Sequence, residues 1–90
     1  MYSREIIQKL LSENSLDEAL RQLDSHLSET PDDADALFLR GKTRWRLGDR
    51  AGATTDYAGA AALCPDGPAA RALELARDVE AFYNTDLYNP

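Results

Sequence analysis

The sequence predicts an all-α fold built from helical hairpins. Apolar residues recur at spacings of three and four along successive segments, and no segment alternates with a period of two. Pro, Gly and Asn residues separate those segments. The chain also resembles itself at an offset of 34 residues. Together these observations predict two hairpin repeats and one closing helix.

The composition excludes several classes of protein. A chain of 90 residues with 43% hydrophobic and 29% charged residues is expected to be one folded domain, or a piece of one, rather than a disordered segment. The net charge of −6 argues against general binding to nucleic acid or to anionic membranes. No apolar run approaches the roughly 20 residues of a membrane span. The single cysteine, Cys64, allows no internal disulfide, so we expect a reducing cytosol and an inert, half-buried thiol.

The first predicted hairpin begins with a helix over residues 3–13. Asn14 ends that helix, because asparagine tolerates left-handed backbone. Ser15 and Glu18 fit the capping box S-x-x-E, which opens a second helix, and Pro31 ends it. The apolar positions of the two helices are Ile6, Ile7, Leu10, Leu11, Leu16, Ala19, Leu20, Leu23 and Leu27.

The second predicted hairpin follows at once. Asp32 or Asp33 caps a third helix. Gly48-Asp49 stops that helix and starts a fourth, which ends before Pro65. The apolar or small positions are Ala34, Leu37, Phe38, Gly41, Trp45, Ala53, Tyr57, Ala60, Ala61 and Leu63.

A fifth helix is predicted to start at Asp66-Gly67-Pro68. Its stripe consists of Ala72, Leu75, Ala76, Val79 and Phe82. The residues after it are rich in aromatic side chains, unlike most free tails. We therefore expect a docked tail, or one that pairs two copies, through Phe82, Tyr83, Leu87 and Tyr88. The alternative is that Phe82 alone packs and the rest of the tail is loose.

The repeat positions resemble the tetratricopeptide repeat family, most closely over residues 34–67. The matching positions are Ala19, Leu23 and Pro31 in the first repeat, and Leu37, Gly41, Gly48, Ala53, Tyr57, Ala60 and Pro65 in the second. The first repeat departs from the family pattern at Ile7 and His26, where small residues are usual. The resemblance implies a right-handed α-solenoid with repeats at 1–33 and 34–67, a capping helix at 68–83 and a tail at 84–90. Small residues at the helix crossings would let the helices approach closely.

The sequence offers no catalytic or metal-binding constellation, so we expect no enzyme and no cofactor. His26 is interpreted as structural or solvent-facing. The acid pairs Asp17-Glu18 and Asp32-Asp33 lie at helix starts, where acids complement the helix dipole. The glycines form no phosphate loop.

Five of the ten bases fall within residues 40–50. Phe38, Lys42 and Trp45 share one helix face there. The resemblance implies that this face and its counterpart in the first repeat line a concave groove. The predicted partner-binding residues are Arg4, Gln8, Leu11, Phe38, Lys42, Trp45 and Arg46. Two interpretations stay open, since Trp45 can instead pack in the core and the bases can be a solvated rim.

The expected function is that of a non-enzymatic scaffold or adaptor in the cytoplasm, which binds a protein or peptide, including acidic segments. The alternative is a structural protein whose repeat ends and aromatic tail pair two copies into a homodimer. A nucleic-acid site on the basic stripe is disfavoured by the net charge. A clamp for a carboxylate would be incomplete, because the fifth helix offers Ala69, Ala72 and Ala76 at the matching positions.

Overall fold

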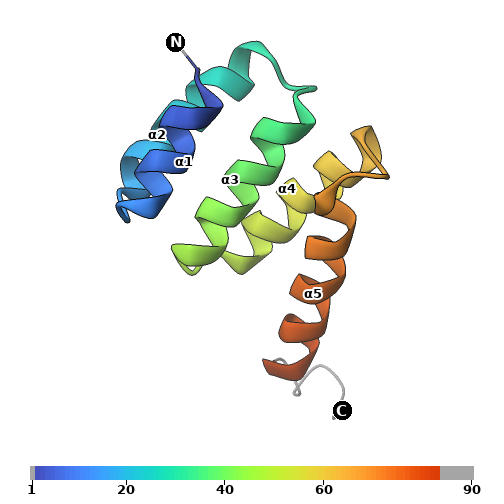
Figure 1. Cartoon of the computed structure of the whole chain (residues 1–90). Helices are drawn as coiled ribbons and strands as arrows, with labels where there is room; N and C mark the ends of the chain where they lie inside the picture. The colour runs from blue at the N-terminus through green and yellow to red at the C-terminus, as the bar shows by residue number, and fades with distance from the viewer. Residues whose placement is uncertain (1, 84–90) are drawn as a thin grey trace.

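The computed structural model describes residues 2–83, with side chains through Val79, and contains five helices and no strand in that range (Figure 1). The predicted all-α class is confirmed. The helices are α1 (Arg4–Ser12), α2 (Leu16–Glu29), α3 (Ala34–Arg46), α4 (Arg50–Leu63) and α5 (Pro68–Tyr83). The predicted docking of the tail lies outside the described residues and side chains.

The turns inside the two hairpins form where the sequence predicts them. Asn14 has a φ of 61° after α1, and Gly48 has a φ of 90° after α3. Asp33 is the N-cap of α3, since its carboxylate accepts a hydrogen bond from the Ala36 N–H at 3.1 Å. Asp49 caps α4 in the same way through the Gly52 N–H. These local signals set the boundaries of the middle helices.

The predicted capping box at the start of α2 is wrong. Ser15 occupies the N-cap position, but its side chain makes no capping hydrogen bond. The Glu18 carboxylate instead accepts hydrogen bonds from Arg21 and Gln22 within the same helix. Those side chains compete for Glu18, so the reciprocal bonds of a capping box do not form.

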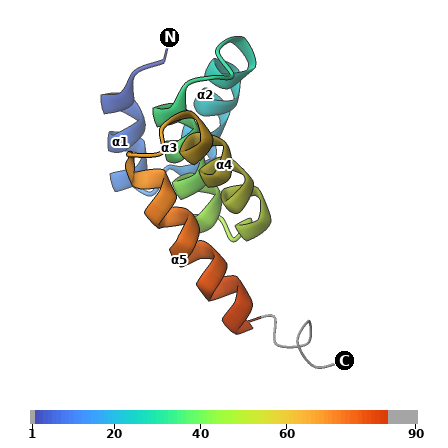
Figure 2. The same ribbon diagram turned by 90° about the vertical axis from the view of Figure 1, so that its right-hand side faces the viewer.

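The core is divided into two clusters on opposite sides of α3. The first cluster is closed and mostly aliphatic, and consists of Ile7, Leu11, Ala19, Leu23, Leu27, Ala36 and Leu39. The second cluster has Ala53, Tyr57 and Ala76 buried at its centre, with Phe38, Trp45, Ala72 and Leu73 partly buried against it. Helix α3 therefore contributes side chains to both clusters, between the α1–α2 pair and the α4–α5 pair (Figures 1 and 2).

A glycine permits the close crossing of α3 and α4. A Cβ atom at Gly41 would lie 2.6 Å from Tyr57 Cε1 and 3.3 Å from the Ala53 carbonyl oxygen. Real Cβ atoms do not approach other atoms so closely, so a larger residue would push the helices apart. The sequence-based expectation that small residues let these helices approach is confirmed at this crossing.

A buried ion cluster joins the two hairpins. Asp56 on α4 is 2% exposed and accepts two hydrogen bonds from Arg40, both 2.9 Å long, and one from Arg44 at 3.1 Å. Arg40 also donates to Asp24 on α2 at 3.0 Å. Hydrogen bonding to Asp56 raises the pKa of Arg40 above its usual value. Two of the five bases of the stripe, Arg40 and Arg44, are thus held by internal ion pairs, which differs from the open interpretation of these bases as a solvated rim.

His26 has a structural role, as expected. Its ring stacks on Tyr2, with centroids 4.0 Å apart, and its Nε2 atom lies 2.8 Å from the Asp33 carboxylate. The expectation of a half-buried Cys64 is wrong, because this residue is exposed just after the end of α4.

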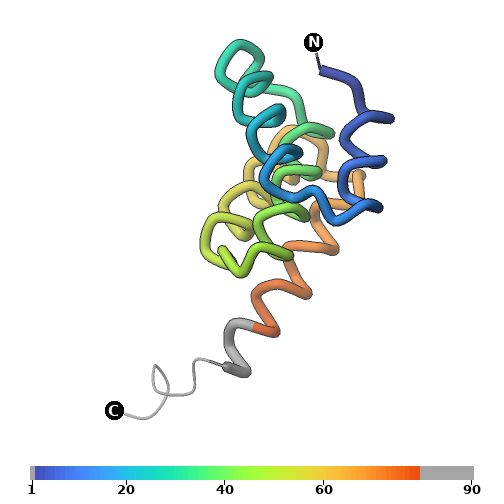
Figure 3. Tube along the Cα trace, turned by 90° about the vertical axis from the view of Figure 1, so that its left-hand side faces the viewer, coloured from blue at the N-terminus to red at the C-terminus, as the bar shows by residue number. Residues whose placement is uncertain are grey.

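Helix α5 diverges from the other four. It packs on α4, and its C-terminal turns run past the turn between α3 and α4 (Figures 1 and 2). Figure 3 shows the first turns of α5 leaving the other helices in the same direction. Among the α5 side chains that are described, through Val79, the exposed charged ones are Arg71, Glu74, Arg77 and Asp78. Within residues 2–83, every helix is too short or too polar to cross a lipid bilayer.

Candidate functional site

Two apolar hollows follow the seam between α3 and α5. The proximal hollow, of about 140 Å³, is lined by Ala34, Asp35, Phe38, Ala60, Cys64, Gly67, Pro68 and Ala69. The distal hollow, of about 370 Å³, is lined by Trp45, Tyr57, Ala72, Leu75, Ala76 and Val79. We call the two hollows together the α3–α5 groove.

The groove exists because α5 presents alanines to α3 and α4. Ala69 and Ala76 are 3% exposed, so α5 packs closely on α4 through them. Alanine is too short to fill the space beside the large aromatic side chains of α3. The seam therefore stays open on its outer side.

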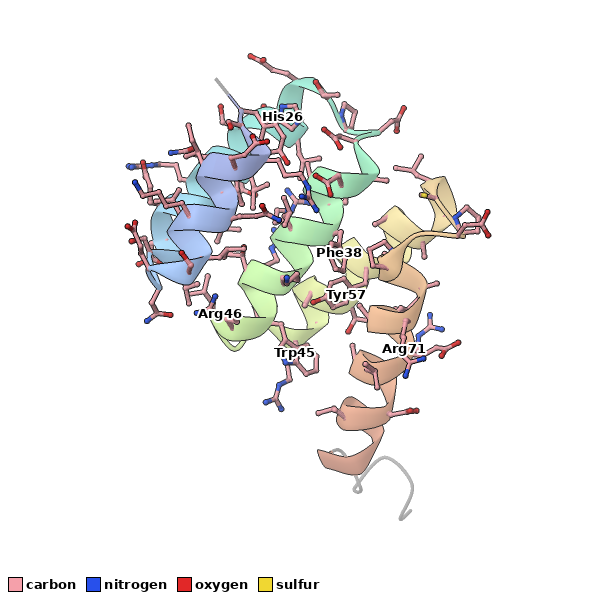
Figure 4. The ribbon with its side chains drawn as sticks, viewed as in Figure 1. His26, Phe38, Trp45, Arg46, Tyr57 and Arg71 are labelled. Carbon is pink, nitrogen blue, oxygen red and sulfur yellow. The ribbon has the colours of Figure 1, made fainter. Side chains whose placement is uncertain are left out.

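Two aromatic side chains of α3 line the groove, Phe38 in the proximal hollow and Trp45 in the distal hollow. The Phe38 and Tyr57 ring centroids lie 5.9 Å apart. Trp45 packs against the second cluster, as the core interpretation expects, and it also lines the distal hollow. Figure 4 shows Phe38, Trp45 and Tyr57 on the side of the α3–α4 pair that faces α5.

Cationic groups lie over both aromatic rings of α3. The Lys42 ammonium is 5.5 Å from the Phe38 ring centroid, and the Arg50 guanidinium is 5.0 Å from the Trp45 ring centroid. Both residues are exposed. Cations at such distances are attracted to the ring faces, which holds positive charge at the edge of an apolar surface.

Two predicted partner-binding residues on α1 lie on the surface. Arg4 and Gln8 are both exposed. Arg4 Nε donates to the Asp35 carboxylate at 2.8 Å, and Asp35 also lines the proximal hollow. Arg4 thus connects α1 to one end of the groove.

The structure places Leu11 and Arg46 in contacts between the hairpins. Leu11 is 6% exposed and belongs to the first cluster. Arg46 donates to the Leu11 carbonyl oxygen at 2.8 Å and to the Asn14 side chain at 2.9 Å. In Figure 4 Arg46 lies toward α1 and α2, away from Phe38 and Trp45. The seven predicted residues therefore do not form one continuous surface.

Sequence reasoning placed α5 in the fold but assigned none of its residues to the site. The repeat offset equated Val79 with Leu11 and Trp45, which was the available signal that this position faces the groove. Leu75 was aligned with Gly41 instead. It is 55% exposed and stands at the outer edge of the distal hollow.

A third hollow, of about 750 Å³, lies between α1 and α2. It is lined by Tyr2, Ile6, Gln22, Ser25, His26 and Glu29. Its walls are more polar than those of the groove, and His26 is already held by Tyr2 and Asp33. The Tyr2 hydroxyl is buried and has no hydrogen-bond partner among the described residues.

Two titratable groups beside the third hollow, Tyr2 and Asp33, have pKa values shifted by their surroundings. Burial raises the pKa of Tyr2 to about 12, with further contributions from Asp35 and Asp33. Burial opposes ionisation of Asp33, but hydrogen bonds from His26 and from the Ala36 N–H outweigh it, so the pKa of Asp33 is lowered. Nowhere in the described part of the chain do three or more His, Cys, Asp or Glu side chains gather as metal ligands.

Comparison of the chain with protein-family models, with curated proteins and with solved structures finds no match.

Proposed function

We propose that this chain is a tetratricopeptide-like interaction module, a scaffold or adaptor that holds an apolar segment of a partner protein in the α3–α5 groove. The observation that carries the proposal is the groove itself, an apolar seam between α3 and α5 beside half-buried aromatic side chains. Grooves of this kind take the apolar face of a helix or the side chains of an extended peptide.

The chemistry of the groove favours apolar anchors with neighbouring carboxylates. Aromatic side chains in partly desolvated pockets supply much of the affinity of protein interfaces. Lys42 and Arg50 place positive charge over those rings. A carboxylate beside an apolar anchor would therefore be attracted to the groove edge, and more strongly at low salt.

The repeat architecture is part of the same proposal. The 34-residue offset, the close α3–α4 crossing at Gly41 and the start of α3 at Ala34 support two stacked hairpins with α5 as the capping helix. We propose a cytosolic location because the chain contains a single cysteine. The proposal involves no catalytic step and no cofactor.

The test compares two exposed leucines. Leu75 lines the groove and is 55% exposed, whereas Leu63 is 45% exposed and lies outside both hollows. Wild type, Leu75→Asp and Leu63→Asp are used as baits in the native lysate, and segments of each retained protein are then titrated against the fluorescence of Trp45. Leu75→Asp should weaken binding tenfold or more, and Leu63→Asp should bind as wild type does. Equal loss in both variants, or a segment that binds without changing Trp45 emission, would refute the assignment of the groove.

A further inference from the structure

The distal hollow is the part of the groove that lies nearest to the end of α5. Val79, which lines it, precedes the last residue of α5, Tyr83, by four residues, or about 6 Å along the helix axis. Trp45 lines it from α3, next to the α3–α4 turn that the C-terminal turns of α5 run past (Figures 1 and 2). The chain that follows α5 therefore begins beside this hollow.

The surface of the distal hollow is apolar. All six residues that line it have uncharged aliphatic or aromatic side chains. Leu75 is 55% exposed at its outer edge, more than any other large apolar side chain in the described part of the chain. Trp45 is also only partly buried. Because covering these surfaces removes them from water, the hollow favours an apolar occupant.

Positive charge lies beside the hollow. The Arg50 guanidinium is over the ring of Trp45, and the Lys42 ammonium is over the ring of Phe38, which lines the neighbouring proximal hollow. Both cations are exposed, and Lys42 takes part in no ion pair among the described residues. The best occupant of the distal hollow therefore has a carboxylate next to its apolar side chain.

The tail that follows α5 in the sequence, residues 84–90, has this chemistry. Its single charged residue is Asp86, and Leu87 and Tyr88 follow directly. In an extended chain, neighbouring side chains point to opposite sides. Leu87 can therefore enter the hollow while the carboxylate of Asp86 stays at the exposed rim, where the cations lie.

The tail is long enough to return to the hollow. Leu87 follows Tyr83 by four residues, which span at most about 14 Å when extended. The return path along α5 is about 6 Å to Val79 and about 12 Å to Leu75. Asn84 begins the tail, and asparagine is among the residues that favour turns, so the sequence suits a reversal at this point.

We propose that the tail occupies the distal hollow of its own chain, with Leu87 against Trp45 and Leu75 and with Asp86 beside Lys42 and Arg50. This inference rests on the proposed use of the groove as a binding surface and adds a built-in competitor for it. A short tether gives the tail an effective concentration of about millimolar. A partner segment must then displace the tail, which lowers the apparent affinity of the groove.

The test measures how far Trp45, the only tryptophan of the chain, is protected from the quencher acrylamide. Leu87→Ser should raise the Stern–Volmer constant about twofold and shift the emission to longer wavelength, because the ring loses its cover. Leu63→Ser is the matched control, since Leu63 is 45% exposed and lies outside both hollows. It should behave as wild type does.

A charge variant tests the role of the carboxylate. Asp86→Asn should also raise the quenching of Trp45, by less than Leu87→Ser, and the increase should disappear at high salt. Asp17→Asn is the control, because Asp17 is an exposed acid on α2 and its change alters the net charge equally. It should leave the quenching unchanged at every salt concentration.

The decisive sample supplies the tail in trans. A synthetic peptide of residues 84–90, at millimolar concentration, should restore the protection of Trp45 in the Leu87→Ser protein. The same peptide should have little effect on wild type, whose hollow is already filled. A peptide that itself carries the Leu87→Ser change should protect neither protein.

Four outcomes overturn the inference. They are unchanged quenching in Leu87→Ser, an equal increase in Leu63→Ser, a peptide that protects wild type and variant equally, and protection in wild type that rises with protein concentration. The last result would mean that a second copy covers the hollow.

The proposed function is judged by a separate measurement. If Leu75→Asp loses its partners while Leu87→Ser leaves Trp45 protected, the groove binds partners without a competing tail, and only the inference fails. If Leu87→Ser exposes Trp45 while Leu75→Asp keeps every partner, the tail occupies the hollow and only the proposed function fails.

Discussion

The two core clusters use the same helix, α3, in opposite ways. On its α1–α2 side, aliphatic side chains are 0–6% exposed and the contact is closed. On its α5 side, Phe38 and Trp45 are only partly buried and the seam contains two hollows. The difference comes from the opposing helix, since α5 offers alanines where larger side chains close the first cluster.

Leu11 and Trp45 make the comparison concrete, because they occupy equivalent positions in the two repeats. Leu11 is covered within the first cluster, and Arg46 of α3 holds its carbonyl. Trp45 meets Ala72 and Ala76, which leave a hollow beside the ring. The same repeat position therefore holds a buried core residue, Leu11, in the first repeat and a partly exposed aromatic residue, Trp45, in the second.

The largest expected effect on stability is at the ion cluster of Asp56, Arg40 and Arg44. Asp56→Ala leaves Arg40 and Arg44 without their shared carboxylate, and should lower the free energy of unfolding by about 3–5 kcal/mol. Asp24→Ala is the control, because its side chain is 49% exposed and its pair with Arg40 is worth at most about 1 kcal/mol. Urea denaturation measures both. Similar losses of unfolding free energy in the two variants would show that the burial of Asp56 does not increase its contribution to stability.

A second prediction compares the packing of the two regions directly. Ala19→Leu inserts three carbons into the closed cluster, where Ala19 is 0% exposed, and should cost about 1–3 kcal/mol or more. Ala72→Leu inserts the same atoms beside the distal hollow and should be neutral or stabilising while it blocks binding. Thermal melts and the Trp45 titration check this pair. If Ala72→Leu destabilises as much as Ala19→Leu, the hollow is not open space.

The third prediction concerns the link between the hairpins at low pH. The folded-state pKa of Asp33 is lowered, so its stabilisation is present above the unfolded-state pKa and is lost as the pH falls through the folded value. Asp33→Asn keeps a capping side chain but removes the pH dependence of this stabilisation. The stabilisation that is lost is less than about 1 kcal/mol, because the site is partly exposed. Urea midpoints measured from about pH 5 downward should therefore converge between the variant and wild type. Parallel curves would contradict the prediction.

The smallest effect is expected at Tyr2, beside the first cluster. Its buried hydroxyl has no partner among the described side chains, which end at Val79, or the described backbone, so Tyr2→Phe should be neutral or stabilise by less than about 0.5 kcal/mol at neutral pH. The pKa of Tyr2 is raised to about 12, so its stabilisation is present below about pH 10 and is lost as the pH rises toward 12. The variant should lack that loss. A clearly destabilised variant at pH 7 would mean that the hydroxyl is hydrogen-bonded.

Features set by local sequence could be predicted well. Asn14 and Gly48 adopt left-handed backbone because few other residues do so at low cost, and Asp33 caps α3 through its own short side chain. Gly41 was identified from its repeat position, and the close approach of Tyr57 explains it. Each of these signals depends on a few neighbouring residues or on one repeat register.

Features that join distant elements were missed. Arg46 bonds to the Leu11 carbonyl across 35 positions, and Arg40 reaches both Asp24 and Asp56. A run of bases in sequence does not reveal which side chains turn inward, because that depends on where acids of other helices lie. Leu75 was missed as a groove residue for the same reason, since its role depends on the path of α5.

The most direct test of the α3–α5 groove as a protein-binding surface places a photoactivated cross-linking amino acid at position 75 and, as control, at position 63. Both native residues are exposed leucines, so the substitution leaves the cores intact. After irradiation in native lysate, mass spectrometry identifies the adducts. We predict protein adducts, to a partner or to a second copy, at position 75 and not at position 63. Equal labelling at the two positions, or no adduct at position 75, would contradict the groove as a binding surface.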